Sequence, residues 1–197
     1  MIAIKPNNYL FPEDYLELER HSEIKHEYID GKIYAMAGGT KAHNTISLNL
    51  AILFREHLQG SLCQTFMSDI KVNLSNKKRF FYPDIVVTCD DNDDQNAYEI
   101  EFPKVIIEVL SESTEQFDRG KKFQFYRTIP SLQEYILVSS QQYLVECFRR
   151  TANNLWLLET YENLEVIAHI ESLELEAPLS LIYATLALDL ITNENNK

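Results

Sequence analysis

Apolar and polar positions follow two different periods along this chain, and together they predict a mixture of helices and strands. In one segment apolar residues recur every fourth position, as on the buried face of a helix. These positions are Ile46, Leu50, Phe54 and Leu58. In a second segment, at 69–74, apolar and polar residues alternate, as in a strand with one buried face. A third run, at 105–110, is apolar except for one residue and predicts a strand buried on both faces.

Turn and cap residues define the helices. Pro12 suits the first turn of a helix, Thr40 suits a helix cap, and Gly60 suits a helix end. Asp30-Gly31 predicts a type I′ turn between two short strands, because both residues tolerate the left-handed backbone that this turn needs. The expected helices run from Pro12 to about His26, from Thr40 to Gly60, from Ser113 or Thr114 to about Arg127, and from Leu179 to Leu188.

The strands complete the predicted fold. Besides 69–74 and 105–110, they are expected at 63–67, 80–88, 134–138, 143–149, 155–160 and 164–170. This order predicts an α/β protein in which helices flank both sides of a mixed central β-sheet. We expect one domain over 10–190 and a disordered polar tail over 191–197.

Composition narrows the setting in which the protein works. No apolar run approaches the ~20 residues needed to cross a bilayer, and the first residues do not form a signal peptide. The 3 cysteines are far apart and lack CxxC spacing, which argues against disulfides and against a zinc knuckle. A reducing, cytoplasmic location without membrane contact is therefore expected.

The formal net charge of −12 argues against a nucleic-acid partner, because affinity for phosphates depends on lysine and arginine. Part of the acid is segregated, however, in 90–94 and 171–176. Basic residues cluster at Lys77-Lys78-Arg79, at Arg119 to Lys122 and at Arg149-Arg150. Such a basic run is more often a solvated turn or helix face than a binding patch, so the charge pattern leaves both interpretations open.

Glu108 is the polar exception within the buried run at 105–110. A carboxylate in such a place must be paired, protonated or bound to a metal, because burying it alone is costly. The alternative to a functional role is a salt bridge to a basic neighbour.

Asp84 is a second carboxylate at a strand boundary, after Pro83 and before the apolar residues 85–87. Taken alone, it could equally be an ordinary residue at the start of a strand. Two carboxylates on neighbouring strands would repel each other unless a cation lies between them. Oxygen ligands of this kind suit magnesium.

Lys122 lies one turn after Asp118 on the helix that follows the strand of Glu108. One interpretation is an Asp118–Lys122 surface pair that contributes only ~0.3–0.5 kcal/mol. The functional interpretation is that the ammonium points back to the strand ends, where it would stabilise developing negative charge.

Taken together, four segments of the chain resemble the Uma2 family (DUF820), a group assigned to the PD-(D/E)XK restriction-endonuclease-like superfamily. The segments are Phe81-Tyr82-Pro83-Asp84-Ile85-Val86-Val87, Val105-Ile106-Ile107-Glu108-Val109-Leu110-Ser111, Asp118-Arg119-Gly120-Lys121-Lys122 and Glu134-Tyr135-Ile136-Leu137-Val138. Glu27-Tyr28-Ile29-Asp30-Gly31 and His43 match the amino-terminal pattern of the family. The resemblance covers about residues 10 to 190 and implies a restriction-endonuclease-like core.

The resemblance also implies roles for individual residues. Asp84 and Glu108 match the two acidic positions of the superfamily motif, and Lys122 matches a lysine that Uma2 proteins carry on the following helix. The third place of the (D/E)XK motif holds Leu110 instead of lysine, which departs from the general pattern. Lys121 is adjacent to Lys122 and could be confused with it.

Two further positions match the amino-terminal pattern of the family. Glu27 could add a metal ligand. His43 could contact a phosphate or a water at the metal, or could simply form a hydrogen bond at its helix start.

These roles combine into a hypothesis of metal-dependent cleavage of nucleic acid. Asp84, Glu108 and the Val109 carbonyl, with help from Glu27, are expected to bind Mg²⁺ or Mn²⁺, and Lys122 is expected to orient the attacking water. By analogy with the superfamily, DNA is the expected substrate ahead of RNA, and a homodimer is a further expectation.

Two rival hypotheses remain at this point. The chain could be a catalytically silent member that serves as a binding or assembly module, which the negative charge favours. The acidic residues could also form a structural salt-bridge core in which Lys122 neutralises Glu108. Metal affinity separates the enzyme from the structural core.

Overall fold

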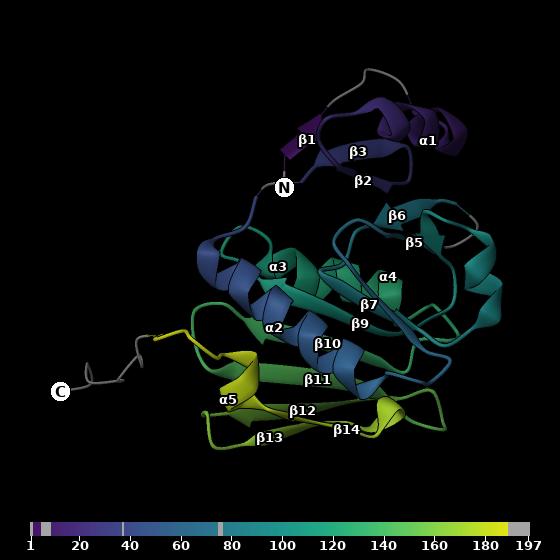
Figure 1. Ribbon diagram of the computed structural model, residues 1–197. Coiled ribbons are helices and arrows are strands. Elements are labelled where there is room, and N and C mark those ends of the chain that lie inside the picture. Colours follow the sequence, from purple (N-terminus) through teal and green to yellow (C-terminus); the bar gives the residue numbers. More distant parts are fainter. Residues whose placement is uncertain (1, 5–8, 37, 75–76, 189–197) are drawn as a thin grey trace.

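The computed structural model describes residues 2–4, 9–36, 38–74 and 77–188 and has a mixed α/β architecture (Figure 1). The expected fold class is therefore confirmed, and both parallel and antiparallel strand pairs are present. The strands divide into two six-stranded sheets and one two-stranded sheet instead of a single central sheet. The tail predicted at 191–197 lies outside the described residues.

The first sheet contains mainly amino-terminal strands in the order β1-β3-β2-β6-β5-β8. Its members are β1 (Ile2–Ile4), β2 (His26–Ile29), β3 (Lys32–Ala35), β5 (Lys71–Leu74), β6 (Arg79–Phe81) and β8 (Glu99–Ile100). Asp30 and Gly31 join β2 to β3 with φ values of 48° and 88°, as the predicted type I′ turn requires.

The second sheet has the order β12-β11-β10-β9-β7-β4 and holds the most buried strands. Its members are β4 (Gln64–Met67), β7 (Ile85–Thr88), β9 (Pro103–Leu110), β10 (Glu134–Ser139), β11 (Leu144–Arg150) and β12 (Trp156–Glu162). β9 and β10 are parallel, whereas the other pairs are antiparallel. A separate hairpin of β13 (Ile167–Ile170) and β14 (Leu175–Pro178) lies beside the second sheet (Figure 1).

The helices begin near the predicted caps but differ in length and regularity. They are α1 (Pro12–His21), α2 (Lys41–His57), α3 (Glu115–Phe117), α4 (Phe123–Tyr126) and α5 (Leu179–Ile182). The Thr40 side chain accepts the His43 N–H, which confirms the predicted cap of α2. α1 ends before the predicted boundary, because His26 belongs to β2 and its N–H bonds to the Glu19 carboxylate.

The predicted third helix is interrupted by a π-helical turn, Asp118–Lys122, which separates α3 from α4. Turns of this type often occur at functional sites, since they change the direction in which side chains project.

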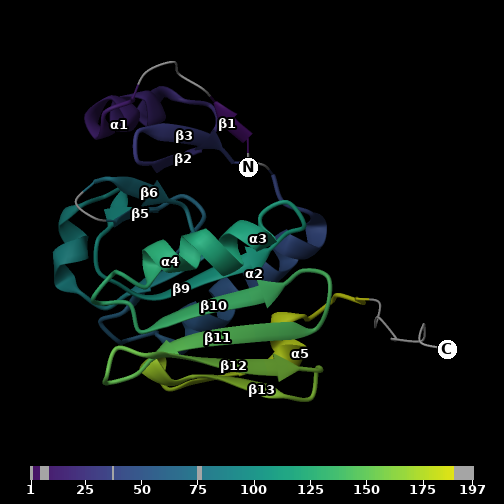
Figure 2. The same cartoon turned by 180° about the vertical axis from the view of Figure 1, so that it is seen from behind.

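Helices cover both faces of the second sheet (Figures 1 and 2). Against one face, the apolar stripe of α2 that includes Ile46 and Phe54 packs on Ile85 and Ile107. Against the other face, Tyr126 of α4 packs with side chains of both sheets. Residues of β7 and β9 that face α3 and α4 therefore lie between the two sheets.

The cysteine prediction is wrong at one place, because Cys63 and Cys89 are joined by a disulfide. Gln64 and Thr88 are partners in the β4–β7 ladder, so the flanking cysteines lie opposite each other. Their separation of 26 residues hides this pairing in the sequence. The disulfide removes the cysteine-based argument for a reducing compartment. In the described ranges, no helix combines the length and the apolarity that crossing a bilayer would require.

Candidate active site

Two carboxylates lie side by side at the centre of the second sheet. Ile85 pairs with Ile107, so the same register brings Asp84 opposite Glu108. Glu108 is 4% exposed, in agreement with its mid-strand position. Asp84 accepts a hydrogen bond from the Val109 N–H at 2.8 Å, which fixes its carboxylate against β9.

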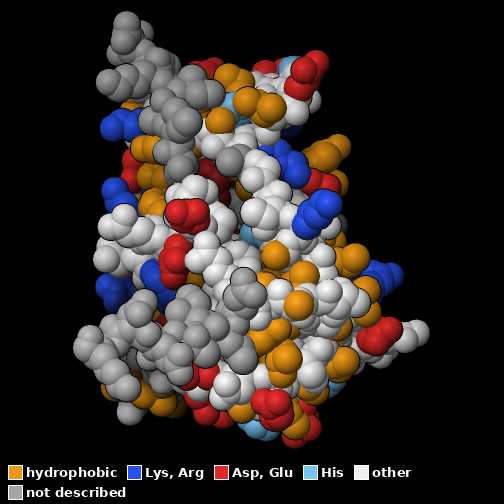
Figure 3. Space-filling view, turned by 90° about the vertical axis from the view of Figure 1, so that its left-hand side faces the viewer, with side chains coloured by type: hydrophobic (Ala, Val, Ile, Leu, Met, Phe, Trp, Pro, Cys, Tyr) orange, Lys and Arg blue, Asp and Glu red, His pale blue; other side chains and the backbone are white. Residues whose placement is uncertain are grey.

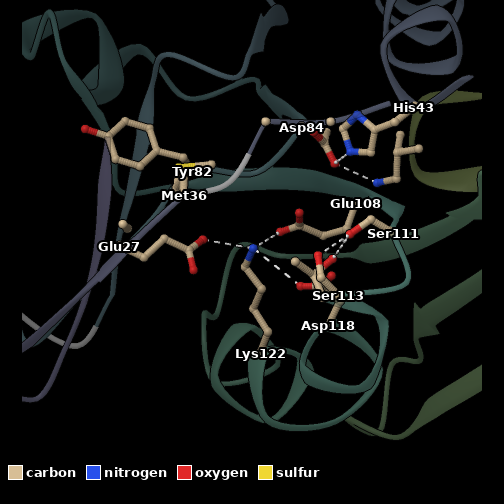
Figure 4. Close-up of a pocket in the computed structure, with 15 residues that line it drawn as sticks. Glu27, Met36, His43, Tyr82, Asp84, Glu108, Ser111, Ser113, Asp118 and Lys122 are labelled. Carbon is tan, nitrogen blue, oxygen red and sulfur yellow. Dashed lines mark hydrogen bonds and ion pairs between the residues drawn. The ribbon is translucent and has the colours of Figure 1, made fainter. Parts of the chain in front are cut away.

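Lys122 points from the π-helical turn into the space between the sheets (Figure 4). Its Nζ lies 2.8 Å from Glu108 Oε1, 3.0 Å from Glu27 Oε1 and 3.6 Å from Asp118 Oδ1. The Asp118 and Lys122 side chains are each only 5% exposed, so the interpretation as a surface pair is wrong. The ammonium instead joins carboxylates from three separate elements.

Glu27 is the contribution of the first sheet to this cluster. It lies on β2, is 3% exposed and directs one carboxylate oxygen to Lys122. Its second oxygen, Oε2, is buried and has no hydrogen-bond partner within the described part of the chain. A buried acceptor of this kind is costly unless water or a cation satisfies it.

His43 lies in the first turn of α2 at the edge of the cluster. Its Nε2 is 3.3 Å from Asp84 Oδ2, so the histidine contacts one of the two central carboxylates. A Cβ atom at Gly39 would lie 2.8 Å from the His43 ring, which explains why a residue without a side chain precedes the histidine here.

Electrostatic interactions hold the cluster in a defined charge state. Burial raises the pKa of Glu108, and the nearby Asp118 and Asp84 raise it further, whereas Lys122 opposes the shift. Burial alone would lower the pKa of Lys122, but Glu108 and Glu27 more than offset it, so the ammonium keeps its proton.

The pKa of His43 is also raised. Burial lowers it, but the Asp84 carboxylate and the Val109 carbonyl together have the larger effect. Four acidic side chains, Glu27, Asp84, Glu108 and Asp118, thus surround one buried ammonium, with His43 at the edge of the cluster.

The cluster lines a cavity of about 110 Å³, large enough for several water molecules. Met36, Gly38 and Gly39 border it on one side, and Ser111 and Ser113 border it on another. In the space-filling view, acidic side chains lie deep in a hollow and lysine or arginine side chains stand at the surface around it (Figure 3).

The donor atoms of the site suit a hard divalent cation. Carboxylate oxygens, a backbone carbonyl and Glu27 Oε2, which has no partner among the described residues, are oxygen donors of the kind that Mg²⁺ or Mn²⁺ prefers. Within the described ranges, no three acidic, histidine or cysteine side chains are already arranged around one metal position. Glu27, Glu108 and Asp118 turn to the Lys122 ammonium instead.

All side chains predicted for the site border the same cavity, although their roles stay predictions. They are Glu27, His43, Asp84, Glu108 and Lys122. Two further residues belong to the cluster. For Asp118, the sequence suggested only the alternative of a surface pair with Lys122. Tyr126, whose hydroxyl donates to Glu108 Oε1 at 3.2 Å, carried no signal beyond its helical spacing from Lys122.

Comparisons with known proteins agree with this geometry. The Uma2 family model, described as "Putative restriction endonuclease", matches residues 12–182. The uncharacterized protein slr1290 of Synechocystis sp. is 40% identical over 190 residues, covering 95% of this chain and 100% of its own. The uncharacterized protein sll1609 of the same organism is 34% identical over 170 residues, with 84% and 96% covered.

A solved structure has the same fold. It is described as a "putative nuclease belonging to DUF820" from Anabaena variabilis and superposes with a TM-score of 0.73 at 17% identity, covering 88% of this chain and 97% of its own. With the family match spanning both sheets and the whole acidic cluster, the chain belongs to the Uma2 family.

Proposed function

We propose that this chain is a metal-dependent nuclease that hydrolyses phosphodiester bonds in nucleic acid, with DNA as its substrate. The observation that carries this proposal is the pairing of Asp84 with Glu108 on adjacent strands, beside a buried and protonated Lys122. The family description as a restriction endonuclease supports the same class of reaction.

Each residue of the site has a proposed role that follows from its chemistry. Asp84, Glu108 and the Val109 carbonyl would hold a Mg²⁺ or Mn²⁺ ion, with Glu27 Oε2 as a further oxygen donor. Such an ion polarises the phosphodiester and lowers the pKa of water. Lys122 orients the attacking water, and its positive charge offsets the negative charge that increases on the phosphoryl oxygens in the transition state. His43 holds Asp84 in place.

Two lysines beside the cavity suit a nucleic-acid substrate despite the net charge of −12. The Lys25 carbonyl accepts the N–H of the cavity residue Met36, and the Lys25 side chain is 41% exposed. Lys41 is exposed at the start of α2, two residues before His43. The Lys25 ammonium is ion-paired with Asp69 and would have to exchange this partner for a phosphate. Binding of a phosphate backbone through these lysines would weaken as salt is added.

We also propose a homodimer formed through β12, the terminal strand of the second sheet. Residues 155–162 contain no lysine, arginine or proline, the residues that usually block a free strand edge. Leu155, Leu157 and Leu158 are each more than half exposed. If β12 pairs antiparallel with β12 of a second copy about a two-fold axis, the same strand edge and the same exposed leucines meet in both copies.

Calorimetric titration of Mn²⁺ and Mg²⁺ tests the metal site directly. We expect binding to the wild type and its loss in Glu108→Gln, which keeps the shape of the side chain but removes its charge. Glu159→Gln, at a half-exposed position on β12, is the matched control and should bind as the wild type does.

Cleavage assays on DNA and RNA then test the reaction. We expect Asp84→Ala and Glu108→Gln to abolish cleavage while the fold is preserved. Retained cleavage in both variants would exclude this assignment. A wild type that binds neither ion and cleaves no substrate would favour the silent binding module.

A further inference from the structure

We propose that Asp118 is a further catalytic residue, which accepts the proton of the water that attacks the phosphodiester. This inference rests on the proposed nuclease function. It begins from the burial of the Asp118–Lys122 pair, because a pair kept only for helix stability has no reason to face the cavity between the sheets.

The backbone holds Asp118 firmly in the site. The residue begins the π-helical turn that also carries Lys122, and it is 3% exposed. The Tyr135 hydroxyl donates to the Asp118 carbonyl at 3.0 Å, which anchors the turn to β10. The side chain borders the same cavity as Asp84 and Glu108.

The distances around Lys122 distinguish Asp118 from the other acids. Glu108 Oε1, at 2.8 Å, and Glu27 Oε1, at 3.0 Å, accept hydrogen bonds from the ammonium. Asp118 Oδ1, at 3.6 Å, is beyond hydrogen-bond distance. A water in the cavity beside this pair can bridge the two groups, donating to Asp118 and accepting from Lys122.

The other carboxylates are less suited to accept this proton. Glu108 Oε1 already accepts from both Lys122 and the Tyr126 hydroxyl. Glu27 Oε2 is the oxygen proposed as a further metal donor, so it is not available for this proton. Asp84 Oδ2 accepts from Val109 and contacts His43. Among the four acids that border the cavity, Asp118 is thus the one for which the described residues supply no close donor.

The proposed step is balanced in atoms and charge. The water oxygen forms a bond to phosphorus while the bond from phosphorus to the leaving sugar oxygen breaks. The water proton moves to the Asp118 carboxylate, and the electron pair of the broken bond stays on the leaving oxygen, which takes a proton from solvent. Lys122 stabilises the charge on the phosphoryl oxygens during the step.

Asp118→Asn tests the role with little change in shape. We expect kcat to fall about 100-fold or more, the usual contribution of a general base. KM, Mn²⁺ affinity by calorimetry and the melting temperature should stay as in the wild type. Glu115→Gln is the matched control, because Glu115 forms an exposed i,i+4 pair with Arg119 on the same segment. It should leave kcat unchanged.

Chemical rescue separates proton transfer from a structural role. In Asp118→Ala, added formate should restore cleavage at least about tenfold, because a small carboxylate can take the vacated place. Formate should not affect the wild type or Glu108→Gln.

The possible failures are distinguishable. Wild-type kcat in Asp118→Asn, or a loss of Mn²⁺ binding in that variant, would overturn the role of Asp118 and leave the nuclease proposal standing. The absence of rescue in a folded Asp118→Ala would also count against proton transfer. A wild type that cleaves nothing would overturn both proposals together.

Discussion

The stability of the site depends on one charged residue, because Lys122 offsets the repulsion among Glu27, Glu108 and Asp118. Removing one partner of a buried ionic cluster leaves the rest uncompensated. At neutral pH we therefore expect Lys122→Met to lower the free energy of unfolding by about 3–5 kcal/mol. Lys121→Met, next to it and exposed, should change this free energy by less than about 0.5 kcal/mol. Urea unfolding of both variants measures the difference.

The loss of stability in Lys122→Met should also depend on pH. Burial raises the pKa of Glu108 and of Glu27 in the folded chain, and without the ammonium nothing opposes this shift. A raised carboxyl pKa adds stability below the unfolded-state value of about 4.3, and this stability is lost as pH rises through the folded-state pKa. The free energy of unfolding of the variant should approach that of the wild type at about pH 5 and fall below it towards pH 8. An equal loss at both pH values would contradict this account.

For individual residues, the sequence was sufficient to identify the two central acids, Asp84 and Glu108, but not all of their neighbours. Glu108 was identifiable because an acid stands in an apolar run, and Asp84 because it precedes another such run. The burial of Asp118 was not predictable, because i,i+4 spacing is the same for a surface pair and for a buried one. Burial depends on the first sheet that covers the helix, and local spacing contains no information about that sheet.

The start of α2 shows how an element positions a functional side chain. Gly38 has open space where a Cβ would be, whereas a Cβ at Gly39 would meet the His43 ring. Gly39→Ala should therefore displace His43 from Asp84, and the raised pKa of His43 should fall towards its ordinary value. Gly38→Ala is the matched control and should leave the pKa unchanged. An NMR titration of the histidine ring protons measures both, and the same pKa in the two variants would argue against this contact.

The turn and the helix cap that depend on neighbouring residues were predictable from the sequence. Strands that form only by pairing with a distant strand were not. The Asp30-Gly31 hairpin and the Thr40 cap depend on neighbouring residues, and both are present as predicted. The short strands β8 and β14 were missed because they exist only through pairing with β5 and β13. The π-helical turn at 118–122 has no signature in apolar spacing, so a regular helix was expected there.

For the molecule as a whole, the terminal position of β12 in the second sheet predicts self-association. We expect analytical ultracentrifugation to show a dimer for the wild type and a monomer for Leu158→Lys, because lysine on a strand edge opposes pairing. Leu62→Lys is the control, since Leu62 is 78% exposed and lies before β4, at the opposite edge of the second sheet. A monomeric wild type, or a dimer in all three proteins, would exclude this interface.

The assembly of the site from two sheets links its chemistry to completed folding. The chain leaves the first sheet at β6 and enters the second at β7, and Asp84 lies on that crossing, whereas Glu27 belongs wholly to the first sheet. A nascent or partly unfolded chain, in which the sheets are not docked, does not have Glu27 in position beside Lys122. If the proposed nuclease activity holds, the enzyme would become active only after both sheets have docked.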